Sequence, residues 1–277
     1  MWLSFSATPS VPRRFPVAFA RSTFAHLPEK RLTIRWHSRR VVSARADTTR
    51  RMARVYWLRA GPGEEVTISA PTAASWAYAE HFRPEEEVFA RARSRSEELG
   101  CVPVPPGTGA VLRLMAAMLP ARAVVEIGTG TGVASLYLLS GMPEDGVLTT
   151  IDVEVENQRA AREAFAEARI RPNRARVIPG RALDVLPRLT DSAYDLVLVD
   201  GDKNEYGAYL DQAIRLLRPG GALAVTSALW HGRVADPAQR DAVTTAIREL
   251  GKRVRDDDRL STALLPCGDG LLLAVLR

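Results

Sequence analysis

The chain has 277 residues, enough for one sizeable α/β domain with some tens of residues to spare. Hydrophobic residues make up 46% and charged residues 25%, as in ordinary globular proteins, so the composition excludes a largely disordered chain. No stretch approaches the ~20 uncharged apolar residues of a membrane-spanning helix, so no membrane partner is expected. Two cysteines, Cys101 and Cys267, are too few for a disulfide framework, and we interpret each as a small buried apolar residue.

The net charge of +6 comes from the first part of the chain. Residues 1–51 hold eleven Lys or Arg and two acids, whereas residues 52–277 hold 27 basic and 30 acidic residues. The segment 1–51 is rich in Arg, Ser and Pro and shows no helical or strand periodicity, so we do not expect it to pack a core. Three interpretations stay open, namely a dispensable stretch before a true start at Met52, a cleaved transit peptide, and a basic arm that binds nucleic acid or lipid.

We favour the dispensable stretch, and a nucleic-acid partner is therefore not expected. Only three of the 38 basic residues are lysine, which is typical of a GC-rich gene in which an upstream start is easily mistaken. The remaining residues, 52–277, are predicted to form one domain. It consists of a helical segment over 52–120 and a core over 121–277.

The predicted elements begin with helices and continue as an alternation of strands and helices. Helices are expected over residues 73–82, 84–99 and 108–119. From residue 121 onward, short apolar strands alternate with helices, which indicates a parallel sheet covered on both faces. The strands are expected at 123–127, 147–152, 175–178, 195–200 and 222–226, and the helices around 133–140, 156–169, 182–189, 205–217 and 237–250.

The last residues break this alternation. Two apolar runs, 260–266 and 271–277, flank the turn Cys-Gly-Asp-Gly and predict a β-hairpin. The expected fold is therefore α/β, with a mostly parallel seven-stranded sheet, a C-terminal antiparallel hairpin and N-terminal helices.

The strongest motif is Val-Val-Glu-Ile-Gly-Thr-Gly-Thr-Gly at residues 124–132, a buried strand that leads through a glycine-rich turn into a helix. Glycine is needed where the backbone turns tightly and approaches a ligand closely. Position 133, where the dinucleotide fingerprint has glycine, holds Val133. This spacing and the acid Glu126 suit an adenosyl group with a charged methionine moiety better than a pyrophosphate. The glycines of the turn are Gly128, Gly130 and Gly132.

Two further groups of acids follow at strand ends. Asp152 stands about 20 residues beyond the glycine turn, where a ribose-binding acid belongs in a Rossmann-like fold. The run Asp-Gly-Asp-Lys-Asn-Glu-Tyr-Gly-Ala-Tyr at residues 200–209 follows the fourth expected strand, at the edge where open α/β sheets bind ligands. Capping of the next helix would explain Asp202 or Asn204, but it would not explain Asp200 and Lys203 together.

With these motifs, the sequence resembles the O-methyltransferase family that includes the caffeoyl-CoA and catechol enzymes, and in particular its small bacterial members of unassigned substrate. The resemblance covers residues 71–277 and extends to LTTID, RPGG at 218–221, ALWHG at 228–232 and LPCGDGLLLA near the end. It implies a Rossmann-like class I methyltransferase fold with S-adenosylmethionine as cofactor. It also implies a small-molecule hydroxyl acceptor, a homodimer and a cytoplasmic location.

The resemblance also implies the functional residues. It places Asp200 on the family's metal-ligand or substrate-binding acid and Lys203 on its catalytic lysine. We expect Lys203, or else His231, to act as general base toward the acceptor hydroxyl, with Asp200 orienting it. The implied cofactor contacts are Val104, Glu126, Gly128, Thr129, Ala134, Ser135, Asp152, Val153, Ala182 and Asp202.

The chain departs from the family where its cation-dependent members end the fifth strand in Asp-Asn. Thr226 and Ser227 stand there instead. A hard divalent cation needs several oxygen ligands, mostly carboxylates, and only Asp200 is clearly available, so a tight metal site is not expected. A protein that binds S-adenosylmethionine with little catalysis, an NAD-dependent oxidoreductase and a nucleic-acid methyltransferase stay open as alternatives.

Overall fold

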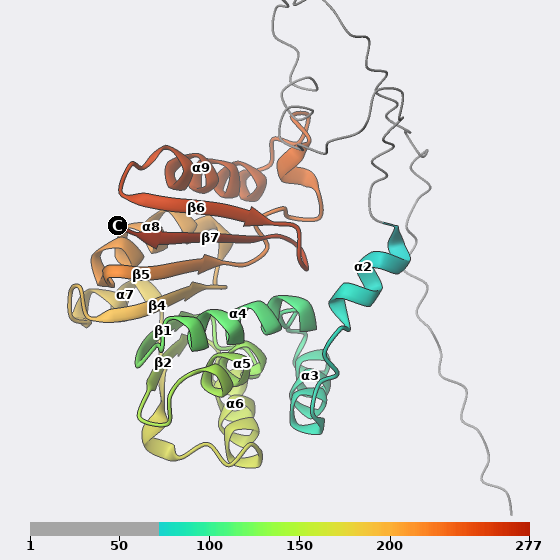
Figure 1. Ribbon diagram of the computed structural model, residues 1–277, viewed down its shortest axis with the longest axis vertical. Helices are drawn as coiled ribbons and strands as arrows, with labels where there is room; N and C mark the ends of the chain where they lie inside the picture. Colours follow the sequence, from blue (N-terminus) through green and yellow to red (C-terminus); the bar gives the residue numbers. More distant parts are fainter. Residues whose placement is uncertain (1–71) are drawn as a thin grey trace, which may run out of the picture. The chain divides into compact units, whose positions relative to one another are not determined.

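The computed structural model describes residues 72–277, which belong to one compact unit, Pro71–Arg277 (Figure 1). The interpretations of residues 1–51, the start at Met52 and the domain boundary there lie outside the described residues. Within residues 72–277, none of the helices is both long enough and apolar enough to span a bilayer.

The centre of the unit is a seven-stranded sheet in the order β3-β2-β1-β4-β5-β7-β6. Strands β1 to β5 run parallel to one another, and β7 runs antiparallel to both β5 and β6. The predicted α/β class, the parallel core and the C-terminal hairpin are thus confirmed. The strands are β1 Ala123–Ile127, β2 Val147–Asp152, β3 Ala175–Pro179, β4 Tyr194–Val199, β5 Leu217–Val225, β6 Leu260–Leu265 and β7 Leu271–Leu276.

Helices cover both faces of this sheet and bury two apolar clusters (Figure 1). Side chains of α3, α4, α5 and α6 pack on one face, and side chains of α7, α8 and α9 pack on the other. Removing this apolar surface from water is the main driving force for the fold. The helices are α2 Ala73–Glu80, α3 Glu87–Leu99, α4 Pro106–Met118, α5 Val133–Gly141, α6 Val155–Glu167, α7 Ala182–Val185, α8 Tyr206–Leu216 and α9 Ala242–Asp256.

Several predicted boundaries were wrong. The helix expected over 182–189 is only the short α7 followed by a 3-10 turn, because Pro187 cannot continue the helical hydrogen bonding. Strand β5 starts five residues before the predicted position, since Leu217 already pairs with Tyr194 across an irregular register. The helix expected over 237–250 begins later, where the Asp241 carboxylate caps it by accepting from the Thr244 N–H.

The close approach of α4 to α5 depends on Gly109. A Cβ at this position would overlap the ring of Tyr137, which is buried and packs on Phe89 with ring centroids 4.5 Å apart. We expect Gly109→Ala to lower the free energy of unfolding by ~1–3 kcal/mol, because the core has to shift to accept the methyl group. Urea denaturation of the full chain measures this change.

Gly251 in α9 is the matched control, because a Cβ there would meet no atom within 4 Å. Replacing a glycine inside a helix by alanine usually stabilises a protein by roughly 0.5–1 kcal/mol. The two substitutions should therefore change stability in opposite directions. Equal effects would contradict the packing of α4 against α5.

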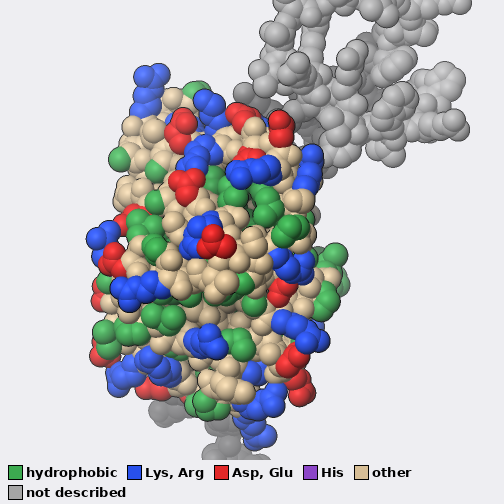
Figure 2. Space-filling view, turned by 90° about the vertical axis from the view of Figure 1, so that its left-hand side faces the viewer, with side chains coloured by type: hydrophobic (Ala, Val, Ile, Leu, Met, Phe, Trp, Pro, Cys, Tyr) green, Lys and Arg blue, Asp and Glu red, His purple; other side chains and the backbone are tan. Residues whose placement is uncertain are grey.

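Figure 2 shows acidic and basic side chains interspersed over the face that it presents, with no extended basic patch there. This agrees with the nearly balanced charge of residues 52–277. The basic excess of the chain lies in residues 1–51. On this face of the described residues, the surface does not have the large positive area typical of nucleic-acid binding proteins.

Candidate active site

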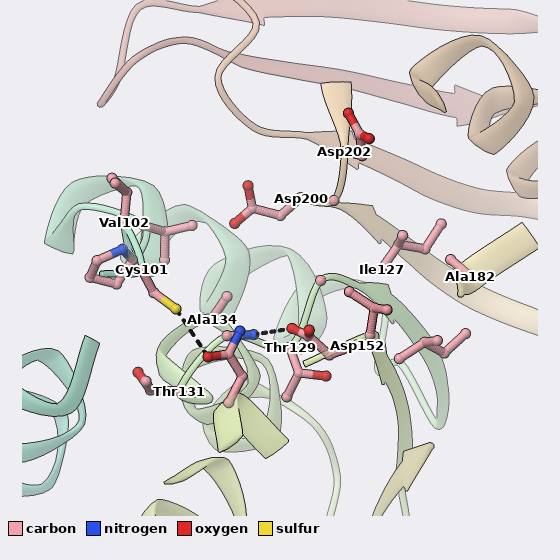
Figure 3. Close-up of a pocket in the computed structure, with 18 of the residues that line it drawn as sticks. Cys101, Val102, Ile127, Thr129, Thr131, Ala134, Asp152, Ala182, Asp200 and Asp202 are labelled. Atoms are coloured by element: carbon pink, nitrogen blue, oxygen red, sulfur yellow. Dashed lines mark hydrogen bonds between the residues drawn. The ribbon is translucent and has the colours of Figure 1, made fainter. Parts of the chain in front are cut away.

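A cavity of about 540 Å³ opens at the carboxyl ends of β1, β2 and β4 (Figure 3). This volume lies in the range of ligand sites, roughly 300–1,000 Å³. The position, next to the crossover between β1 and β4, is where open α/β sheets bind ligands. The cavity brings together eleven residues predicted from sequence, namely Val104, Gly128, Thr129, Gly130, Ala134, Asp152, Val153, Ala182, Asp200, Asp202 and Lys203.

The glycine-rich turn forms the floor of the cavity. Gly128 adopts φ +94°, and a Cβ on it would overlap the carbonyl group of Asp200, so no other residue fits between β1 and β4. Gly130 adopts φ +50°, and a Cβ on it would meet no atom within 4 Å. Gly128 therefore serves the packing of the strands, and Gly130 serves the left-handed backbone of the turn.

The carboxylate of Asp152 fixes this turn to the end of β2. One of its oxygens accepts from the Gly130 N–H at 2.8 Å, and the other accepts from the Glu154 N–H at 2.8 Å. Figure 3 places Asp152 beside Thr129 at the cavity. The predicted ribose-binding acid is thus held by backbone donors on both sides, which sets the direction of its remaining lone pairs.

Glu126, Ser135 and Gly132 do not line the cavity, although the sequence predicted them as cofactor residues. Glu126 is fully buried beneath the turn, and its Oε2 accepts a hydrogen bond from the Ser135 hydroxyl. Burial raises the pKa of the Glu126 carboxyl to about 8, against the hydrogen bond from Ser135. These residues support the turn from behind.

Asp200 and Lys203 meet at the wall of the cavity, just after β4. Asp200 accepts a hydrogen bond from the Thr226 hydroxyl, and its Oδ1 lies 3.8 Å from the Nζ of Lys203. Burial raises the pKa of the Asp200 carboxyl, while the positive charge of Lys203 and the Thr226 hydroxyl act to lower it. The predicted pair of acid and lysine is therefore in contact.

Two other groups hold the Lys203 side chain. Its Nζ donates to the carbonyl oxygen of Gly201 at 3.2 Å and lies 5.8 Å from the ring centroid of Tyr206. Asp202, next to it, caps the following 3-10 turn by accepting from the Asn204 N–H. Asp202 is thus the capping residue of this segment, while it also lines the cavity.

His231 lies outside the cavity. Its side chain is 72% exposed, its Nδ1 is 3.6 Å from an Asp269 oxygen, and its ring lies beside that of Trp230. Ser227, Trp230 and His231 all have positive φ, which residues other than glycine seldom adopt. Of the two candidate bases, only Lys203 lines the cavity.

The donor set does not fit a divalent cation. Thr226 bonds to Asp200 through its hydroxyl, and Ser227 follows it in the position of the family's amide. Between residues 72 and 277, no three His, Cys, Asp or Glu side chains are grouped so that they could hold a metal ion. One carboxylate with one hydroxyl is a poor set of ligands for Mg²⁺.

Several residues of the cavity wall were not predicted from the sequence. Arg181 forms an ion pair with Glu205, and Glu205 in turn accepts from the Tyr209 hydroxyl at 2.6 Å. Cys101, interpreted as a buried apolar residue, is only partly buried; it donates to Asn157 and lines the cavity, and Cys267 is likewise only partly buried. The contacts of Arg181 with Glu205 and of Cys101 with Asn157 join residues far apart in the chain, so local patterns carried no signal for them.

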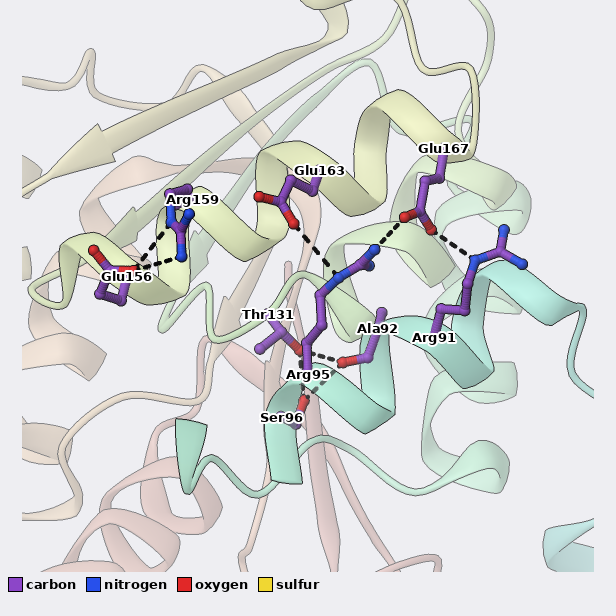
Figure 4. A network of polar contacts seen from close by, with 9 residues as sticks. All are labelled: Arg91, Ala92, Arg95, Ser96, Thr131, Glu156, Arg159, Glu163 and Glu167. Carbon is purple, nitrogen blue, oxygen red and sulfur yellow. Dashed lines mark hydrogen bonds and ion pairs between the residues drawn. The ribbon is translucent and has the colours of Figure 1, made fainter. Parts of the chain in front are cut away.

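Helix α3 contributes Ser96 to the wall of the cavity. Two sets of polar contacts hold this helix in place (Figure 4). Arg91 and Arg95 form ion pairs with Glu163 and Glu167 of α6. The hydroxyl of Thr131, inside the glycine turn, donates to the Ala92 carbonyl at 2.8 Å and bonds with the Ser96 hydroxyl, and Ser96 and Thr131 are both buried. The turn is therefore hydrogen-bonded to a helix that precedes the whole sheet.

Comparisons with known proteins agree with this geometry. A family model described as O-methyltransferase matches residues 79–277. A protein of Mycobacterium sp. (strain JLS) that is named as an O-methyltransferase is 50% identical over 198 residues, which cover 72% of this chain and 90% of that protein.

Solved structures give the same result. A crystal structure of a Corynebacterium glutamicum protein is 34% identical with a TM-score of 0.68, covering 72% of this chain and 94% of that one. The O-methyltransferase TomG of Streptomyces achromogenes, involved in tomaymycin synthesis and solved in complex with SAM, is 28% identical with a TM-score of 0.67. That match covers 74% of this chain and 96% of TomG.

The sheet order, the glycine turn and the cavity define a Rossmann-like methyltransferase. Within this class, the chain belongs to the O-methyltransferase family, because the family model matches 199 of its 277 residues, from residue 79 to 277. The alternative of an NAD-dependent oxidoreductase is therefore wrong.

Proposed function

We propose that this O-methyltransferase uses the residues of the cavity to methylate a hydroxyl group of a small molecule, with S-adenosylmethionine as methyl donor. The observation that supports this proposal is that a single cavity is lined both by the glycine turn with Asp152 and by Asp200 with Lys203. A donor site and an acceptor site therefore lie within one volume.

The lining of the cavity fits the cofactor. Asp152 offers carboxylate oxygens for ribose hydroxyls beside the glycine turn, and small apolar side chains border the space for a flat adenine ring. S-adenosylmethionine supplies a methyl group on a positively charged sulfur, which needs no further activation by the protein. The apolar residues are Val104, Ala134, Val153 and Ala182.

The residues that bind the acceptor then have to orient its hydroxyl group and to remove the proton from it. We assign the proton to the Nζ of Lys203, which lines the cavity and is held by Asp200 and the Gly201 carbonyl. Only the neutral amine can accept it, so the ammonium group of Lys203 first passes one proton to the solvent. Asp200, itself fixed by the Thr226 hydroxyl, orients Lys203 and the incoming hydroxyl. Holding both reactants in line accounts for most of the catalysis that such a site has to provide.

Calorimetric titration of the full chain with S-adenosylhomocysteine, with and without Mg²⁺, tests the cofactor site and its metal dependence together. We expect micromolar binding that Mg²⁺ does not change, and turnover that EDTA does not lower, because Thr226 replaces the acid that a metal would need. Loss of turnover in EDTA, restored by Mg²⁺, would overturn the metal-independent assignment. Binding without turnover across a wide panel of hydroxyl acceptors would favour the alternative of a protein that holds the cofactor without catalysis.

We also propose that the chain is a cytoplasmic homodimer. Helix α2 supports the dimer, since none of its residues is buried and its neighbourhood exposes Trp76, Tyr78 and Phe82. Exposed aromatic residues grouped in this way are typical of a surface that another protein covers. Light scattering after gel filtration measures the mass, and a monomer of 30.3 kDa would contradict the dimer.

A further inference from the structure

Glu126 is a buried acid that the methyl transfer does not use. Its side chain has no solvent exposure, Oε2 accepts from the Ser135 hydroxyl, and Oε1 has no hydrogen-bond partner among the described residues. The hydroxyl of Thr150, which is bonded to that of Thr129, acts with Ser135 to lower the pKa of the Glu126 carboxyl, but burial outweighs both. An ionised carboxylate at such a place costs much free energy unless several donors or a positive charge compensate it.

The charged groups around Glu126 are unfavourable for a second negative charge. Asp152 at the end of β2 and Asp200 at the end of β4 both act to raise its pKa, in addition to burial. The ammonium group of Lys203 lies beside Asp200. From α5, Glu126 receives only the neutral hydroxyl of Ser135. The protein thus places three carboxyl groups at one edge of the sheet.

The cavity is bordered by residues that adjoin Glu126 and Ser135 in the chain. Ile127 and Gly128, which follow Glu126 in the chain, line the cavity, and so does Ala134, which precedes Ser135. The methionine part of the cofactor carries an ammonium group, and its sulfur carries a second positive charge. A positive charge bound there would stabilise the ionised form of a buried acid near it.

We propose that Glu126 is protonated in the cofactor-free protein and ionises when the ammonium group of the cofactor binds, so that binding releases one proton. In this step the O–H bond of the carboxyl group breaks, the oxygen keeps the electron pair, and the proton passes to the solvent. The inference rests on the proposed function, since it requires the cofactor in this cavity.

The pH dependence follows with a definite sign. Because the complex contains the carboxylate, affinity for the cofactor increases with pH and levels off above the free protein's value of about 8 for the pKa of Glu126. Below that pH, the affinity for the cofactor falls by up to a factor of ten for each unit by which the pH decreases. In the cofactor-free protein the same raised pKa makes the free energy of unfolding decrease as the pH rises. Its contribution to stability is complete below the unfolded value of 4.5 and is lost as the pH rises through about 8.

Calorimetry in several buffers counts the proton. The full chain is titrated with S-adenosylhomocysteine at pH 7.0 in phosphate, HEPES and Tris, and the measured enthalpy is plotted against the ionisation enthalpy of the buffer. The slope gives the number of protons released. We expect about 0.9, because a group with a pKa of about 8 is about nine-tenths protonated at this pH.

Two variants and a second ligand identify the group. Glu126→Gln should reduce the slope to zero, and Glu156→Gln, an exposed acid of α6 that pairs with Arg159, should leave it unchanged. The ligand 5′-deoxy-5′-methylthioadenosine, which lacks the amino-acid part, should bind without releasing the proton. If Glu126→Gln does not fold, this comparison of ligands on the unmodified chain decides.

The outcomes separate the inference from the function. Absence of S-adenosylhomocysteine binding would overturn the proposed function. Binding with a slope of zero would overturn the inference and leave the function intact. A slope that persists in Glu126→Gln would also overturn the inference, because the proton would then come from another group.

Discussion

Replacing Lys203 by methionine is expected to lower turnover by a factor of ~10²–10⁴, the usual contribution of a general base. The reason is that the Nζ of Lys203 lines the cavity beside Asp200, whereas His231, the other candidate base, lies outside it. Lys203→Arg should lose activity similarly, because a guanidinium group keeps the charge but does not accept a proton at neutral pH. The measurement is the formation of S-adenosylhomocysteine with an acceptor found by screening hydroxyl compounds.

The affinity for S-adenosylhomocysteine should stay the same in both variants, which separates a catalytic effect from a folding defect. Lys252→Met is the matched control, since Lys252 is exposed on α9. Unchanged turnover in Lys203→Met would remove this residue from the mechanism. Full activity in Lys203→Arg alone would show that Lys203 acts through its charge and not as a base.

Replacing Asp152 by alanine is expected to weaken the binding of S-adenosylhomocysteine about a hundredfold. The carboxylate accepts from two backbone N–H groups and joins the glycine turn to β2, and each hydrogen bond to a charged group contributes roughly 1.5–3 kcal/mol. Loss of about 2.7 kcal/mol of binding free energy corresponds to a hundredfold change in Kd. Calorimetric titration measures it.

Asp145→Ala provides the comparison, because Asp145 is an exposed acid that pairs with Arg122 before β2. It should leave the Kd unchanged. A Kd in Asp152→Ala within threefold of that of the unmodified chain would contradict the role of Asp152 in cofactor binding.

Regular patterns in the sequence predicted the sheet well. They also indicated to which face of the sheet Glu126 points. Side chains alternate between the two faces of a strand, and in β1 Val124 belongs to one apolar cluster while Val125 and Ile127 belong to the other. Glu126 therefore points to the face of Val124, whereas Ile127 lines the cavity. The motif identified the turn correctly, but only the strand period shows that its acid lies beneath the site.

Other features had no local signal. The ion pair of Arg181 with Glu205 depends on how two loops at neighbouring strand ends approach each other. The course of the loop after β5 depends on positive φ at Trp230 and His231, which residues other than glycine seldom adopt, and no local pattern placed His231 outside the site. Such details are set by tertiary packing, which overrides local preference.

The hydrogen bond from Thr131 to the Ala92 carbonyl also bears on where the smallest working unit of this enzyme begins. A chain that started at Ala121 would retain all seven strands, yet it would lack Ser96 and the segment 101–104, which form one wall of the cavity. It would also leave the Thr131 hydroxyl without its acceptor. Deletions from the N-terminal side therefore have to stop before Glu87, the first residue of α3, if the wall is to be kept.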